Sequence, residues 1–176
     1  MANNAGGFKN FGPTYPTTDY VRLGYEGSLN GVHNISPTLV AAAASANGEA
    51  NAELAGSFAA MAEDGVTTAN DGGANAVGLF REDLHDMVNA SGKATFYFRG
   101  GEYYVQEARL ADGEYANINV GDGITAGANG KIRKAADSDR ILGTVTYKGA
   151  YKAGNMYEWA GSAMNGGNYL GFIMHI

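Results

Sequence analysis

The residues best suited to acid–base or metal chemistry lie between positions 82 and 86. Glu82, Asp83, His85 and Asp86 form the densest group of ionisable side chains in the sequence. Carboxylate oxygens are the ligands that divalent cations prefer, and Glu82 and Asp86 would share one face of a helix. Charged residues opposite an apolar stripe are, however, the usual solvated face of an amphipathic helix. The pattern favours that second interpretation, so we predict neither a metal site nor a cofactor.

One glycine-rich run has the spacing of a dinucleotide-binding loop. Gly121, Gly123 and Ala126 match the G-x-G-x-x-A pattern after a predicted strand at 118–120. In a true site this loop leads into a helix whose N-terminus faces the pyrophosphate. Residues 127–130 instead contain two glycines and an asparagine, which break helices. The run is therefore predicted to form turns.

The sequence contains no nucleophile elbow, HExxH motif, phosphate-binding loop or EF-hand loop. It has no cysteine, which excludes disulfides, thiolate ligands and cysteine nucleophiles. His33 and His175 have no partner at ligand spacing. These features favour a protein that is not an enzyme. An enzyme whose carboxylates meet only on folding stays an alternative.

Many aromatic residues of the second half could stack against sugar rings. They are Tyr97, Tyr103, Tyr104, Tyr147, Tyr151, Tyr157 and Trp159. In strands, such residues more often form cross-strand pairs or core. We predict core or subunit interface, and a carbohydrate-binding or receptor-binding module is the alternative function.

The charge of the chain argues against nucleic acid as a partner. The formal net charge is -6 and the isoelectric point is about 4.9, whereas nucleic-acid binding requires clustered basic residues. Lys131, Arg133 and Lys134 come close together, but alternation on a hairpin explains them. No apolar run approaches the ~20 residues that cross a bilayer, and no signal peptide is recognisable. We therefore expect a soluble protein with no membrane partner.

The elements that position these residues are predicted to form one mainly β domain with minor α, preceded by an extended N-terminal arm at residues 1–20. The arm holds two of the three prolines and four aromatics, Phe8, Phe11, Tyr15 and Tyr20. Pure linkers are poor in aromatics, so these side chains should be buried somewhere. Two interpretations are open. The arm folds back onto its own domain, or it docks on a neighbouring subunit.

Residues 21–176 are predicted to form the single β-rich domain. Within it, residues 36–92 read as helical and alanine-rich, with Ser36 and Pro37 as an N-terminal cap. The helical spacing of Leu54, Phe58 and Met61 suggests that helix continues toward residue 63. Residues 66–78 are predicted to be an exposed loop. A further helix is expected from position 80 to 88, ended by Gly92.

Residues 93–176 are predicted to form a small β-barrel or sandwich. Alternation at 94–98, a turn at Gly100–Gly101 and renewed alternation at 102–109 indicate a hairpin. Short strands with glycine, asparagine and aspartate between them follow at the spacing of a sandwich or barrel. Their predicted ranges are 114–120, 131–135, 140–147, 155–160 and 168–176.

The runs 120–127 (VGDGITAG), 130–135 (GKIRKA) and 141–145 (ILGTV) resemble the β-barrel segment of the capsid decoration, or cement, proteins of tailed bacteriophages. The shared feature is a rhythm of G-D-x-I/V, G-x-V-x-x-A and G-x-V that lays down short strands between glycine turns. The resemblance covers about residues 103–176. Such proteins also have extended arms that lie across neighbouring capsid subunits.

The resemblance implies a non-enzymatic virion protein, made in the host cytoplasm, that stabilises the capsid surface. Its expected partners are the major capsid protein, contacted through Phe8, Phe11, Tyr15 and Tyr20 of the arm, and itself, as a homotrimer. Residues 36–92 depart from the pattern. They are either an insertion or a sign of another virion component, such as a tail-tube or fibre protein.

Overall fold

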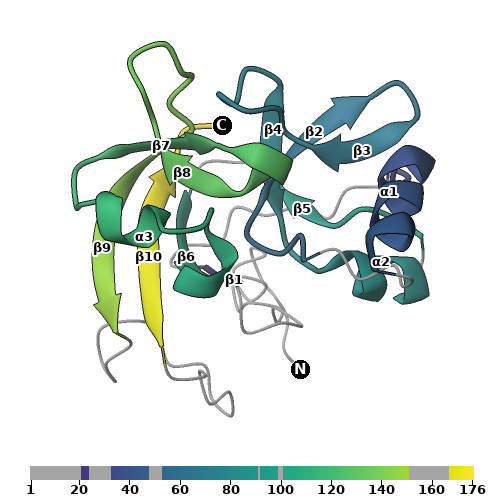
Figure 1. The fold of residues 1–176 in the computed structure, drawn as a ribbon, viewed down its shortest axis with the longest axis horizontal. Coiled ribbons are helices and arrows are strands. Elements are labelled where there is room, and N and C mark those ends of the chain that lie inside the picture. The colour runs from purple at the N-terminus through teal and green to yellow at the C-terminus, as the bar shows by residue number, and fades with distance from the viewer. Residues whose placement is uncertain (1–20, 24–32, 48–52, 91, 99–100, 151–166) are drawn as a thin grey trace, which may run out of the picture.

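The computed structural model describes residues 21–23, 33–47, 53–90, 92–98, 101–150 and 167–176 (Figure 1). The described chain is mainly β with a few short helices, as predicted. Its strands are β1 (Val21–Leu23), β2 (Phe58–Ala62), β3 (Gly65–Thr68), β4 (Ala76–Phe80), β5 (Phe96–Tyr97), β6 (Gly101–Gln106), β7 (Gly123–Ala126), β8 (Ile132–Lys134), β9 (Gly143–Ala150) and β10 (Asn168–Met174). Its α-helices are α1 (Pro37–Asn47), α2 (Leu84–Ala90) and α3 (Glu114–Asn117).

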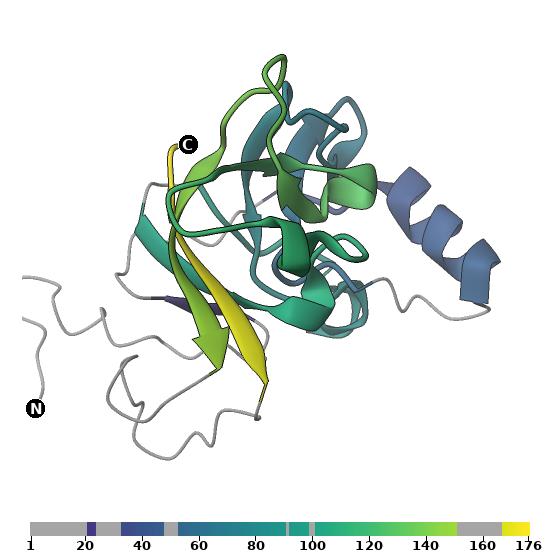
Figure 2. The ribbon, with the colours of Figure 1, turned by 60° about the vertical axis from the view of Figure 1, so that its left-hand side comes forward.

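The strands form two antiparallel sheets. The six-stranded sheet has the order β1-β6-β10-β9-β7-β8, and the four-stranded sheet has the order β3-β2-β4-β5. The larger sheet curls into a half-barrel, with β9 and β10 as a long twisted ribbon (Figure 2). The smaller sheet lies beside it, and α1 projects at the far side of the smaller sheet (Figures 1 and 2).

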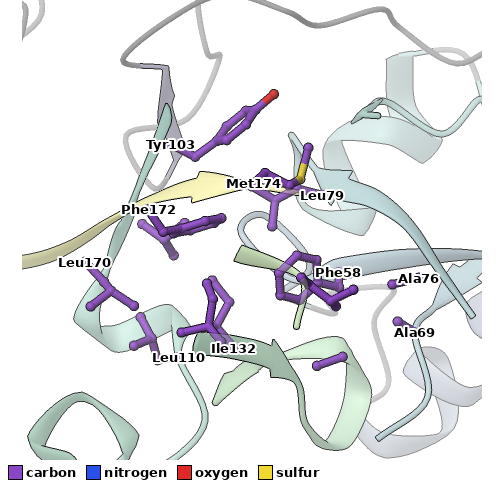
Figure 3. Packing of buried hydrophobic residues seen from close by; sticks show 14 of the residues in the cluster. Phe58, Ala69, Ala76, Leu79, Tyr103, Leu110, Ile132, Leu170, Phe172 and Met174 are labelled. Carbon is purple, nitrogen blue, oxygen red and sulfur yellow. The ribbon is translucent and has the colours of Figure 1, made fainter. Parts of the chain in front are cut away.

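One hydrophobic core joins the two sheets (Figure 3). Phe58 of the smaller sheet lies against Phe172 of the larger one, with ring centroids 6.3 Å apart. Tyr103 contacts Phe172 and also Tyr97, at centroid distances of 6.0 and 5.2 Å. Phe58, Phe172 and Tyr103 are fully buried. The aromatic residues therefore supply much of the core volume, as expected for a chain whose apolar fraction is rich in alanine.

A second apolar cluster lies where α1 and α2 meet the smaller sheet. It includes Phe80, Leu84 and Met87. An ion pair with one buried partner lies next to it: Arg109 is 5% exposed and donates from Nη1 and Nη2 to the two carboxylate oxygens of the partly buried Asp83, at 3.1 and 3.0 Å. The carboxylate of Asp83 also accepts the backbone N–H groups of two residues in the 53–57 turn. Asp83 thus ties three segments together.

The start of α1 follows the predicted cap. The Oγ of Ser36 accepts the N–H of Leu39 at 3.3 Å, and Ser36 and Thr38 each donate a hydroxyl to Asp64 at 2.8 Å. These bonds, with that of Thr38 first, lower the pKa of Asp64. A shallow depression lies here, but its hydroxyls are used to hold the helix. Gly92, with φ of 67°, ends α2 as predicted and donates to the Met87 carbonyl.

Several predictions for residues 36–92 are wrong. Leu54 precedes strand β2, whereas Phe58 and Met61 lie in it on opposite faces, so their helical spacing does not place them on one apolar stripe: Phe58 is fully buried and Met61 is 43% exposed. The expected loop at 66–78 contains most of β3 and the start of β4. Helix α2 begins only at Leu84, and Phe80 belongs to β4.

The hairpin expected around Gly100–Gly101 is also wrong. Strand β5 pairs with β4 in the smaller sheet, whereas β6 pairs with β1 and β10 in the larger one. The chain crosses between sheets at this point. The strand expected at 114–120 is replaced by α3, whereas β8, β9 and β10 confirm the strands expected at 131–135, 140–147 and 168–176. The strand expected at 155–160 lies outside the described residues.

Candidate partner-binding face

The six-stranded sheet has an inner face on the core and an outer face that points away from it. Because successive side chains of a strand point to opposite faces of a sheet, each residue can be assigned to the inner or the outer face. Leu170, Phe172 and Met174 of β10 belong to the main core cluster, so Tyr169, Gly171 and Ile173 lie on the outer face. The paired strands add Glu102 and Tyr104 from β6 and Thr144, Thr146 and Tyr147 from β9.

A tyrosine cluster, defined as Tyr104, Tyr147 and Tyr169, occupies one end of the outer face. The rings of Tyr104 and Tyr147 pack edge to face with centroids 6.0 Å apart. They lie over Gly171, where an added Cβ would come within 2.6 Å of the Tyr104 ring. Tyr104 is 9% exposed and Tyr169 is fully buried. The outer face therefore has its own small aromatic core.

Glu102 fixes the geometry next to this cluster. Its Oε1 accepts the hydroxyl of Tyr104 at 2.8 Å and the hydroxyl of Thr146 at 3.0 Å. The carboxylate thus bridges β6 and β9 across β10. A ring held by packing and by a charged acceptor has few alternative rotamers, so this part of the face is rigid.

An isoleucine row crosses the other end of the outer face. Ile173 is paired with Thr144, which on its other side is paired with Gly123. The side chain of Ile141 lies across Gly123, whose missing Cβ would be 3.3 Å from it. Ile141 and Ile173 are 53% and 47% exposed. Two large exposed apolar side chains on one face are suited to contact with another protein surface.

Two of the three basic residues around the β7–β8 hairpin, Arg133 and Lys134, are neutralised by carboxylates. Arg133 donates to Asp71 from Nε at 2.8 Å and to Asp139 from Nη1 at 2.8 Å. Lys134 donates from Nζ to Asp122 at 2.7 Å. The bonds from Arg133 and then from the Ala136 N–H lower the pKa of Asp139. These cations are engaged within the domain, which fits the hairpin interpretation and not a phosphate-binding patch.

Acid should loosen this hairpin. Because the folded-state pKa of Asp139 lies below its ordinary value of 3.8, its stabilising effect is present above that pH and is lost as pH falls through the lowered pKa. We expect Asp139→Asn to lower the melting temperature at neutral pH, with the gap to wild type narrowing in acid. Thermal melts across pH measure this. Exposed Asp137→Asn is the matched control, and an Asp139→Asn gap that stays constant with pH would contradict the assignment.

Substitution of Gly171 tests the tyrosine cluster. Gly171→Ala places a methyl 2.6 Å from the Tyr104 ring and 2.8 Å from Cβ of Tyr147, so the rings must move. Overpacking of this kind costs about 1–3 kcal/mol of unfolding free energy. Urea denaturation measures it. Gly113→Ala is a control in which the methyl meets nothing within 4 Å, although its φ of 75° adds some strain. Equal stability of Gly171→Ala and wild type would show that the rings are not packed as described.

The residues singled out from the sequence have different outcomes. Phe8, Phe11, Tyr15 and Tyr20 lie outside the described residues, as do Tyr151, Tyr157 and Trp159. Tyr97, Tyr103 and Tyr104 are buried, which confirms them as packing residues. The turns predicted for the glycine-rich run are wrong at Gly123–Ala126, which form strand β7, and the following residues form a 3-10 turn where a nucleotide site would need a helix.

The acidic group at 82–86 is only partly the solvated helix face that we predicted: His85 and Asp86 are exposed on α2, but Glu82 and Asp83 are not part of that face. Glu82 is 8% exposed and accepts the Thr95 hydroxyl at 3.0 Å, and Asp83 holds Arg109. Both precede the first residue of α2, so Glu82 and Asp86 do not share a helix face. Among the described residues, no three His, Asp or Glu side chains lie close enough to hold a metal ion. Within the same ranges, no helix is long and apolar enough to span a bilayer.

Sequence reasoning missed the isoleucine row. The available signal was parity: in the predicted strand 168–176, Phe172 and Ile173 must point to opposite faces, so one of them had to leave the core. Comparison with protein-family models, with curated proteins and with solved structures found no match. The outer face is therefore interpreted from its own geometry.

Proposed function

We propose that this chain is a structural protein of a tailed-bacteriophage virion that decorates the capsid and stabilises it by binding the outer surface of the major capsid protein lattice. The observation that carries the proposal is the isoleucine row, Ile141 and Ile173, exposed on the outer face of the six-stranded sheet. Such a row suits a flat contact with another protein. The resemblance of residues 103–176 to decoration proteins is the reason that we propose the major capsid protein as the partner in this contact.

A lattice makes modest contacts sufficient. Burying an isoleucine completely contributes about 1.5–3 kcal/mol, and Ile141 and Ile173 each have roughly half of that still to gain. When one part of the molecule is bound to the lattice, the other binding parts are held near their sites, which raises their effective concentration there. A homotrimer that presents three isoleucine rows and three arms to one lattice position would therefore bind tightly through weak single contacts.

The arm supplies the second contact in this proposal. Phe8 and Phe11 precede Val21 by ten or more positions. If the arm is fully extended, both side chains can therefore reach a surface more than about 25 Å from the sheet. Aromatic side chains bury large areas and fill pockets at interfaces. We assign the four aromatic residues of the arm, Phe8, Phe11, Tyr15 and Tyr20, to the lattice contact.

The alternative of a carbohydrate-binding or receptor-binding module has less support. A stacking platform needs exposed ring faces, whereas Tyr97, Tyr103, Tyr104 and Tyr169 are all buried. Within the described part of the chain, Tyr147 of the tyrosine cluster keeps partial exposure, and its hydroxyl donates to the Ala150 carbonyl. These rings hold the sheet.

Removal of the arm tests the function. Deletion of residues 1–20 should leave a melting transition like that of the full chain, because the core residues lie downstream. Its affinity for empty capsids of the encoding phage should fall about tenfold or more, which corresponds to about 1.4 kcal/mol. Co-sedimentation with capsids measures the affinity. Full binding by the truncated chain would remove the arm from the mechanism, and no binding by the full chain would refute the function.

A further inference from the structure

We infer that Arg140 positions Ile141 in the isoleucine row by holding the segment between β8 and β9 against the loop between β3 and β4. The first of these, residues 135–142, is here called the joining segment, and the second, residues 69–75, the β3–β4 loop. Arg140 acts on the partner through Ile141. Its effect on binding rests on the proposed function, whereas its effect on the joining segment is a property of the free chain.

The two isoleucines of the row are held in different ways. Ile173 lies within β10 and is paired with Glu102 on one side and Thr144 on the other. Ile141 precedes β9 and belongs to no strand. Its side chain lies 3.3 Å from the place where Gly123 lacks a Cβ, yet it is 53% exposed. The position of Ile141 therefore depends on what holds the backbone of the joining segment.

The chain after Ile141 is fixed by burial and by backbone hydrogen bonds. Leu142 is fully buried, its N–H donates to the Ile124 carbonyl at 2.8 Å, and its carbonyl accepts the His175 N–H at 2.8 Å. The chain before Ile141 has no such apolar anchor, because positions 136–138 and 140 are all exposed. Polar bonds must hold that side.

Arg140 supplies the bonds on that side. Its backbone N–H donates to the Gly72 carbonyl at 3.0 Å, and its Nη1 donates to the carbonyls of Ala76 and Ala74 at 3.0 and 3.5 Å. A charged guanidinium makes stronger hydrogen bonds than a neutral donor. Ala76 is 3% exposed and belongs to the main core cluster, so this acceptor is itself fixed.

The β3–β4 loop is a close support for the joining segment. A Cβ on Gly73 would lie 2.7 Å from Cδ1 of Leu142, and a Cβ on Gly72 would lie 3.1 Å from Oδ1 of Asp139. The backbone of the loop therefore packs on both sides of Arg140 and Ile141. The Gly72 N–H also donates to the Ala126 carbonyl at 2.9 Å, which binds the loop to β7. A loop of the smaller sheet thus shapes the outer face of the larger one.

Hydrogen exchange of the full chain, followed by mass spectrometry, tests the positioning role. In Arg140→Ala, amides of the joining segment should exchange roughly fivefold faster than in wild type, because the bonds of the guanidinium are lost. Peptides of β10 that contain Ile173 should exchange at the wild-type rate. Lys131→Ala is the matched control, since it also removes one positive charge, and it should leave both regions unchanged. Unchanged exchange in Arg140→Ala, or a rise that extends equally to β10, would overturn the inference.

Co-sedimentation with empty capsids of the encoding phage tests the consequence for binding. Arg140→Ala should lower the affinity roughly fivefold, since the apolar contact of Ile141 is misplaced. Added to Ile141→Ala it should cause no further loss, because nothing is left to position, whereas added to Ile173→Ala it should multiply the loss. General destabilisation would multiply the loss in both backgrounds, and that result would overturn the inference. If the wild-type chain does not bind capsids, the proposed function fails, and the exchange measurement alone decides the role of Arg140.

Discussion

Asp83→Ala is expected to lower the free energy of unfolding by about 3 kcal/mol, the low end of the range found when removal of one partner leaves a buried charge unpaired, because Asp83 itself is 20% exposed. The guanidinium of Arg109 is 5% exposed and would lose both of its bonds to Asp83. The N–H groups of Leu54 and Ala55, which donate to Asp83 Oδ1 at 3.0 and 2.9 Å, would lose their acceptor too. Urea denaturation gives the value.

Glu53→Ala is the matched control. Glu53 lies 3.7 Å from the same guanidinium but is 61% exposed, and exposed ion pairs contribute about 0–1 kcal/mol. A large difference between the two variants is therefore expected. If Asp83→Ala were as stable as Glu53→Ala, the ion pair would not hold the turn at 53–57 against the segment before α2.

Phe172→Ala is expected to cost about 3–5 kcal/mol as well, because it leaves a cavity at the centre of the core. Phe172 is fully buried between Phe58 and Tyr103, which come from different sheets. Losing this ring removes a contact on which the packing of the two sheets depends. Thermal or urea unfolding measures the loss.

The neighbouring residue provides the control. Ile173 is 47% exposed on the outer face, so Ile173→Ala should cost well under half as much. Similar costs for both variants would mean that β10 does not separate an inner from an outer face at these positions.

The sequence correctly predicted those helices and strands whose start or end is marked by residues close to them in the chain. Ser36 and Pro37 marked the start of α1, Gly92 marked the end of α2, and the glycine-separated runs after residue 130 marked β8, β9 and β10. Each of these depends on residues a few positions apart. The mainly β class followed from them.

The errors arose where pairing partners are distant in sequence. The residues between β5 and β6 are typical of a hairpin turn. The two strands nevertheless do not pair with each other: β5 pairs with β4, and β6 pairs with β10. Which strand lies beside which is set by burial across both sheets. The residues of a turn therefore do not predict which strands are neighbours in a sheet.

The candidate site shows the same limit. Asp83 looked like a surface residue, because its partner Arg109 lies 26 residues away and only folding brings the two together. The exposure of Ile141 and Ile173 was not predicted, because hydrophobicity alone does not tell which face of a strand is covered. The aromatic residues of the arm remain predictions.

Electron cryomicroscopy of capsids incubated with the full chain tests the central claim most directly. The account predicts additional density outside the shell at local threefold positions, with the six-stranded sheet turned so that Ile141 and Ile173 face the major capsid protein. Bare capsids at saturating protein, or density confined to the tail or to the interior of the particle, would contradict it.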